Sequence, residues 1–137
     1  MASNNRIVSI VDDDMDITQL FHDALCKISG VSVFAFNDSV KALEHFTSKK
    51  EEYIIVLSDY RMPSFKGLDL LRKVKTLSPR VRTVLMSAYD VGGDDLLLKY
   101  MIEEIINTFI QKPVTIYHLC EEVNRQIHAY QLSSDRK

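Results

Sequence analysis

An aspartate that directly follows an apolar run is the clearest candidate for chemistry in this sequence. Residues 54–57 are a short run of aliphatic side chains that stops at Ser58 and Asp59, a pattern typical of a strand buried on both faces. In open parallel sheets, ligands bind at the carboxyl ends of the strands. Asp59 therefore has the position of a nucleophile or metal ligand, although a single aspartate there is equally typical of a turn.

Polar residues follow three other apolar runs in the same way. Because the carboxyl ends of parallel strands meet at one edge of a sheet, these residues are expected to lie near Asp59. Converging carboxylates repel one another unless a cation lies between them, and hard oxygen ligands favour Mg²⁺ or Mn²⁺. A lysine and a hydroxyl beside them would bond phosphoryl oxygens, so the set predicts phosphoryl transfer to a carboxylate nucleophile. Its members are Asp12, Asp13, Asp14, Asp59, Ser87 and Lys112.

Apolar runs and amphipathic helical patterns alternate along the whole chain. The five runs cover residues 6–11, 31–36, 54–57, 81–86 and 107–111. Strict strand–helix alternation with right-handed crossovers predicts a parallel sheet with helices on both faces. The expected fold class is therefore α/β, with a doubly wound, five-stranded parallel sheet.

The length of 137 residues fits one domain. We expect a disordered N-terminus over residues 1–5, the domain over residues 6–131 and a polar tail over residues 132–137.

Charge and hydropathy exclude two classes of partner. The formal net charge is −2 and no run of lysine or arginine occurs, so direct binding to nucleic acid is not expected. No stretch of eighteen apolar residues occurs and the N-terminus lacks the apolar segment of a signal peptide. The sequence therefore predicts no membrane contact and a cytoplasmic location.

The fourth helical pattern, residues 95–104, is apolar on more than one face. Such a helix is either buried in the core or has an exposed apolar face that binds a partner. Packing into the core is the simpler explanation, and a partner-binding face is the other. The apolar residues are Leu96, Leu97, Leu98, Tyr100, Met101 and Ile102.

Together, the motifs at the strand ends resemble the receiver domain of two-component response regulators. They are VDDD at residues 11–14, DYRMP at residues 59–63 with Gly67 after it, Ser87 followed by Ala88, and Lys112 followed by Pro113. The resemblance covers nearly the whole chain and implies a flavodoxin-like sheet with strand order 2-1-3-4-5. It implies a signalling phosphoacceptor, not an enzyme acting on other molecules, that catalyses its own phosphorylation and dephosphorylation.

The resemblance also implies a role for each matching residue. Asp59 would be the phosphoacceptor, and Ser87 and Lys112 would bond the phosphoryl group. Phe109 would be the switch aromatic, and Asp14 would lie outside the site as a helix cap. The implied cofactor is Mg²⁺ or Mn²⁺, and its protein ligands would be Asp12, Asp13, Asp59 and the backbone carbonyl of Arg61.

The implied partners are a sensor histidine kinase or phosphotransfer protein and an unknown downstream protein. A homodimer through the fourth helix, fifth strand and fifth helix is a further expectation. One alternative is a receiver-like interaction module that works without phosphorylation. Another is a haloacid-dehalogenase-like phosphohydrolase, whose D-x-D-x-T pattern fits Asp14, Asp16 and Thr18.

Three positions of this sequence are ones at which members of the family differ from one another. Asn107 stands two residues before Phe109, where the family commonly has alanine or glycine. Arg61 and Tyr89 follow Asp59 and Ser87 by two residues, at positions that the family uses to tune phosphoryl lifetime.

Overall fold

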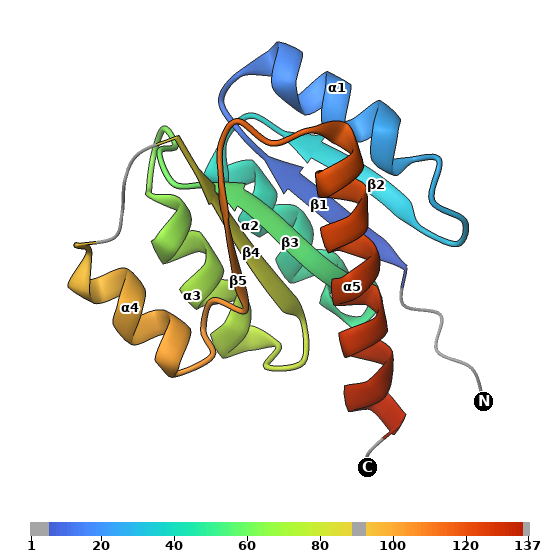
Figure 1. Cartoon of the computed structure of the whole chain (residues 1–137). Coiled ribbons are helices and arrows are strands. Elements are labelled where there is room, and N and C mark those ends of the chain that lie inside the picture. The colour runs from blue at the N-terminus through green and yellow to red at the C-terminus, as the bar shows by residue number, and fades with distance from the viewer. Residues whose placement is uncertain (1–5, 89–92, 136–137) are drawn as a thin grey trace.

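Five parallel strands form one sheet in the computed structural model of the protein, which describes residues 6–88 and 93–135 (Figure 1). The strand order is β2-β1-β3-β4-β5, so the predicted fold class and strand order are confirmed. The strands are β1 (Ile7–Val11), β2 (Ser32–Phe36), β3 (Tyr53–Asp59), β4 (Arg82–Ser87) and β5 (Thr108–Gln111). The helices are α1 (Met15–Leu25), α2 (Ser39–Lys49), α3 (Gly67–Leu77), α4 (Asp95–Ile102) and α5 (Ile116–Asp135), with a 3₁₀ turn at Lys50–Glu52.

Helices cover the sheet on both faces, as the alternation predicts. Residues of α1 and α5 pack on one face, and residues of α2, α3 and α4 pack on the other (Figure 1). The central strands are buried on both sides: in β3, Val56 belongs to the cluster under α2 and α3, whereas Ile55 and Leu57 belong to the cluster under α1 and α5. Fully burying such a side chain stabilises the fold by about 1.5–3 kcal/mol. This rigid sheet positions the residues at its carboxyl edge.

The described residues begin at Arg6 and end at Asp135, close to the expected limits of the domain. Residues 1–5 and 136–137 lie outside the described residues. Helix α5 continues to Asp135, so the segment expected as a polar tail is largely the last turn of that helix. No described helix is both long and apolar enough to cross a membrane.

Helix α4 is much more exposed than core packing predicts. Among its described residues, Leu97 alone is buried, whereas Leu98 is 59% exposed and Ile102 is 74% exposed. The expectation that its apolar side chains pack into the core is therefore wrong for most of them. The helix lies at the side of the domain, next to β5 and α3 (Figure 1), so only one of its faces reaches the core.

A polar cluster holds the start of β5 against β4 and α3. The side-chain oxygen Oδ1 of Asn107 accepts hydrogen bonds from the backbone N–H of Thr83 at 2.9 Å and from Nζ of Lys75 at 2.7 Å. Nζ of Lys75 also donates to the carbonyl of Val81 at 2.6 Å. The backbone N–H of Asn107 also donates to the Thr83 carbonyl at 3.0 Å. The strand begins at Thr108, one residue later than the sequence predicts.

Candidate functional site

The ends of β1 and β3 bring three carboxylates together. The two strands are neighbours with Val11 opposite Ser58, so the residues that follow, Asp12 and Asp59, lie side by side. Each of Asp12, Asp13 and Asp59 offers a carboxylate oxygen within 4.8 Å of the others. Asp12 is buried, Asp59 is half-buried and Asp13 is exposed, so the cluster opens to solvent on one side. The structure thus brings together three of the acids that the strand ends place at this edge of the sheet.

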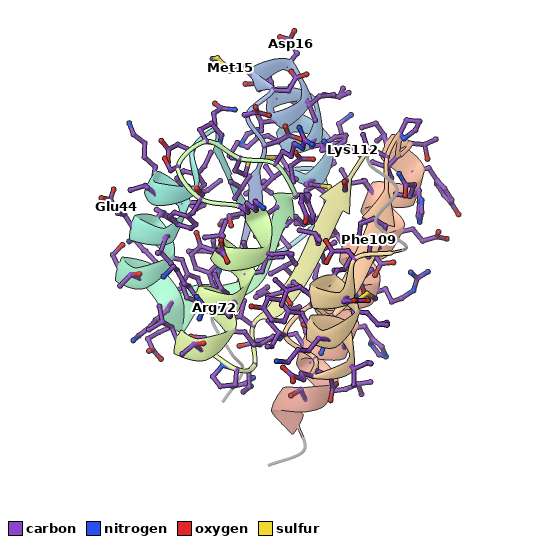
Figure 2. All side chains as sticks on the ribbon, turned by 90° about the vertical axis from the view of Figure 1, so that its left-hand side faces the viewer. Met15, Asp16, Glu44, Arg72, Phe109 and Lys112 are labelled. Atoms are coloured by element: carbon purple, nitrogen blue, oxygen red, sulfur yellow. The ribbon has the colours of Figure 1, made fainter. Side chains whose placement is uncertain are left out.

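Lys112 neutralises part of this charge. Its Nζ lies 2.6 Å from Oδ2 of Asp12 and 2.8 Å from Oδ1 of Asp59. In Figure 2, Lys112 lies near the upper end of the molecule, and Phe109 lies below it, toward α4. The lysine reaches the acids because β5 ends at the same edge of the sheet as β1 and β3. It therefore stands between two of the three carboxylates.

The surroundings raise the pKa of both Asp59 and Lys112. Burial raises the pKa of Asp59, the bond to Lys112 opposes this, and the neighbouring Asp12 carboxylate raises it further. Burial alone would lower the pKa of Lys112, but the bonds to Asp12 and Asp59 outweigh it and the pKa is raised. Lys112 is therefore held as a cation.

Backbone contacts orient the acids. The Oδ1 atom of Asp12 accepts a hydrogen bond from the N–H of Asp14 at 3.0 Å, and the amide of Asn37 donates to the Asp12 carbonyl at 2.8 Å. The N–H of Arg61 donates to Oδ2 of Asp59 at 3.2 Å. Both oxygens of Asp59 thus have a donor, and the backbone of Arg61 lies beside the carboxylate. The contribution of Asn37 was not predicted, because asparagine after a strand is also typical of a helix cap.

Asp14 lies outside the acidic cluster. Its Oδ1 accepts from the N–H groups of Asp16 at 3.0 Å and Ile17 at 3.2 Å, and so caps α1. The predicted role of Asp14 as a helix cap is confirmed. A phosphohydrolase in which Asp14 is the nucleophile does not fit this placement.

The other two expected site residues lie on β4 and β5. Ser87 is the last residue of β4, is buried, and its carbonyl accepts from the N–H of Lys112 at 2.8 Å. Since Met86 pairs with Asp59 in the sheet register, Ser87 lies one residue beyond the candidate nucleophile on the neighbouring strand. Phe109 is half-buried and packs on the cluster beneath α2, α3 and α4, away from the acids. Tyr89 lies outside the described residues.

Gly67, the first residue of α3, leaves no space for a side chain. A Cβ atom there would lie 2.1 Å from the carbonyl oxygen of Asp59 and 3.0 Å from Oγ of Ser58. Its N–H donates to the carbonyl of Tyr60 at 3.0 Å, which closes the loop after β3. From the sequence alone Gly67 marks only the end of a loop; in the structure it lets α3 start against the backbone of Asp59.

Replacing Gly67 with alanine is expected to lower the free energy of unfolding by about 3 kcal/mol, because the clash is with backbone and cannot be relieved by a side-chain rotation. Urea unfolding followed by circular dichroism measures this. Gly93→Ala is the matched control: a Cβ atom at Gly93 meets nothing within 4 Å, and the change should stay within about 0.5 kcal/mol. Equal stability of the two variants would contradict the close approach.

Comparisons with known proteins agree with this geometry. The family model described as "Response regulator receiver domain" matches residues 8–124. The chain is similar to a cyclic di-GMP phosphodiesterase of Thermotoga maritima, with 30% identity over 131 residues, which is 92% of this chain and 33% of that protein. It is 28% identical over 123 residues to sporulation initiation phosphotransferase F of Bacillus subtilis, covering 90% of this chain and 94% of that one.

Solved structures show the same fold. A response regulator receiver domain protein from Clostridium thermocellum aligns with a TM-score of 0.80 and 25% identity, covering 93% of this chain and 98% of that chain.

The chain is also 31% identical over 122 residues to the DNA-binding transcriptional regulator NtrC of Escherichia coli K12. This alignment covers 81% of this chain but 25% of that protein. The chain thus spans about a quarter to a third of the length of the first curated relatives it matches. It belongs to the family of response regulator receiver domains.

Proposed function

We propose that Asp59 accepts a phosphoryl group from the phosphohistidine of a sensor histidine kinase or phosphotransfer protein. The observation that carries this proposal is the position of Lys112, whose Nζ contacts both Asp59 and the buried Asp12 within a cluster of three acids. An ordinary surface aspartate has no need of a half-buried lysine and two further carboxylates. A site that must hold a highly charged phosphoryl group does.

Contacts to each oxygen orient the nucleophile. Lys112 holds Oδ1 of Asp59 and the Arg61 N–H holds Oδ2. An Asp59 oxygen attacks phosphorus, the P–O bond forms as the P–N bond to histidine breaks, and the imidazole leaves with the electron pair of that bond. Lys112 then bonds a phosphoryl oxygen, and the Ser87 hydroxyl donates to another. Water attacking the same phosphorus forms a new P–O bond as the bond to the Asp59 oxygen breaks, which releases inorganic phosphate and restores the carboxylate. In this scheme the protein catalyses both its phosphorylation and its dephosphorylation.

The acidic cluster fits a divalent cation. Three carboxylates with oxygens within 4.8 Å are hard ligands of the kind that Mg²⁺ or Mn²⁺ prefers. Asp12, Asp13, Asp59 and the backbone carbonyl of Arg61 would hold the ion. When bound, it supplies positive charge for the phosphoryl oxygens.

The output is a change at the surface formed by α4, β5 and α5. Exposed Leu98 and Ile102 on α4 give this surface an apolar character, and half-buried Phe109 lies between it and the site. A phosphoryl group draws Ser87 and Lys112 inward, and Phe109 follows. The surface then binds a downstream protein or a second copy of the chain. The expected location is the cytoplasm, where ATP is available to the kinases.

The test is the intact mass of the protein after incubation with a small acyl phosphate, with and without Mg²⁺. The wild type should gain one phosphoryl group only with Mg²⁺, and Asp59→Asn should gain none. Asp14→Asn is the matched control: asparagine also caps helices, so this variant should be modified like the wild type. Sedimentation of the modified protein then reports any self-association.

The opposite result has a clear meaning. If neither the acyl phosphate nor a phosphorylated histidine donor modifies the wild type, the chain is an interaction module that works without phosphorylation. An adduct that persists in Asp59→Asn would place the acceptor elsewhere.

A further inference from the structure

Tyr60, the residue after Asp59, is hydrogen-bonded to β4, to α3 and to the residue before α4. Its N–H donates to the carbonyl of Met86, the residue before Ser87, at 2.7 Å. Its carbonyl accepts a hydrogen bond from the N–H of Gly67 at 3.0 Å. Its hydroxyl donates to Oδ2 of Asp94 at 2.8 Å, across 34 positions of sequence. One residue therefore joins the end of β4, the start of α3 and the residue that precedes α4.

Asp94 is the N-cap of α4 and uses its two oxygens differently. Oδ1 accepts from the N–H of Leu97 at 3.0 Å, which caps the helix, and Oδ2 accepts from Tyr60. Both bonds lower the pKa of Asp94, the Leu97 bond more, and the bond to Asp94 is the main cause of the raised pKa of Tyr60. The carboxylate is therefore ionised and both of its bonds are charge-assisted.

Among the described residues, helix α4 is only shallowly attached to the rest of the domain. It has eight residues, a length that is not stable as an isolated helix, and Leu97 is its one buried residue among those described. The opposite end is held separately, because the N–H groups of Ile105 and Ile106 donate to the carbonyl of Tyr100 at 2.8 and 3.1 Å. The Tyr60 bond is therefore well placed to set the position of the N-terminal end.

We propose that Tyr60 is a positioning residue that holds α4 in its resting place through Asp94 and carries the state of Asp59 to that helix. This rests on the proposed function. When Ser87 moves toward a phosphoryl oxygen, the adjoining Met86 carbonyl moves with it and displaces the N–H of Tyr60. The hydroxyl then leaves Asp94, and α4 shifts away from the position that it has in the unphosphorylated protein. The hydrogen bond belongs to the unphosphorylated state.

Two variants remove this bond and leave the helix cap in place. Tyr60→Phe deletes only the hydroxyl, and in Asp94→Ser the shorter side chain still caps α4 but does not reach Tyr60. In the unphosphorylated protein, each should raise amide hydrogen exchange in residues 95–102 by about tenfold, as loss of a charge-assisted hydrogen bond implies. The double variant should exchange no faster than either single variant, because both remove the same contact.

A second measurement tests whether Tyr60 couples phosphorylation of Asp59 to α4 or only supports the helix. Phosphorylation of the wild type should change exchange in residues 95–102, and in Tyr60→Phe this change should shrink at least threefold although the phosphoryl adduct still forms. Resting exchange equal to that of the wild type, additive effects of the two variants, or an undiminished response to phosphorylation would each overturn the proposal. If the wild type forms no adduct with any donor, the proposed function fails, and the resting-state comparison still decides whether Tyr60 positions α4.

Discussion

Lys112→Met is expected to lower the free energy of unfolding by about 3 kcal/mol when no divalent cation is present. The change leaves the buried carboxylate of Asp12 beside Asp59 with no cation between them. Removing one partner of a buried ion pair typically costs about 3–5 kcal/mol, and the lower figure applies because the cluster opens to solvent at Asp13. Urea unfolding in the presence of a chelator measures the loss.

Added Mg²⁺ should restore part of this stability, because the bound ion would then neutralise the acids in place of the lysine. Lys99→Met is the control: Lys99 is exposed on α4, and its replacement should change the free energy by less than about 0.5 kcal/mol. A loss below 1 kcal/mol for Lys112→Met would mean that water already screens the carboxylates. In that case the lysine serves phosphoryl binding alone.

Asn107→Ala is expected to be as damaging, at about 3 kcal/mol, although the residue lies far from the acids. The substitution leaves the N–H of Thr83 without its acceptor and removes one of two oxygens that contact Nζ of Lys75. A buried donor left unpaired costs about 1–3 kcal/mol, and more if it is charged. Thermal and urea unfolding measure the effect. The double variant Lys75→Met with Asn107→Ala should lose less than the sum of the single losses.

The pH dependence gives an independent check on the same cluster. Burial is the main reason that the pKa of Lys75 is lowered from 10.5 to about 8, the Arg82 cation lowers it further, and Glu104 opposes both. Between these values the unfolded chain binds more protons than the folded one, so Lys75 makes stability rise with pH from about 8 to 10.5. In Lys75→Met this component should vanish. Parallel stability curves for the two proteins would show that the amine is solvated.

The parts of the fold and site that could be predicted are those set by local pattern. Asp59 could be placed because an apolar run buried on both faces must stop where the strand leaves the sheet, and the residue at that point is visible in the sequence. Lys112 could be placed beside it because every strand of a parallel sheet ends at the same edge. Neither step requires knowledge of side-chain packing.

The parts that were missed depend on contacts between distant residues. The pattern of α4 shows that it is apolar but not how much of the sheet is left for it to cover, and this led to the wrong expectation for Leu98 and Ile102. The bonds of Tyr60 to Asp94 and of Lys75 to Asn107 join residues 34 and 32 positions apart. Each depends on the reach of a side chain across a loop, for which a single sequence carries no periodic signal.

The strand order has a consequence for synthesis of the chain. If the strands add in the order in which they leave the ribosome, β3 joins the free edge of β1 once β1 and β2 have paired, and β4 and β5 then each join the edge of the strand before. Asp12, Asp13 and Asp59 can therefore come together before the strand that leads to Lys112 exists. The nascent sheet carries an uncompensated acidic edge until β5 docks, so attraction between these acids and the lysine favours the last strand addition and completes the domain.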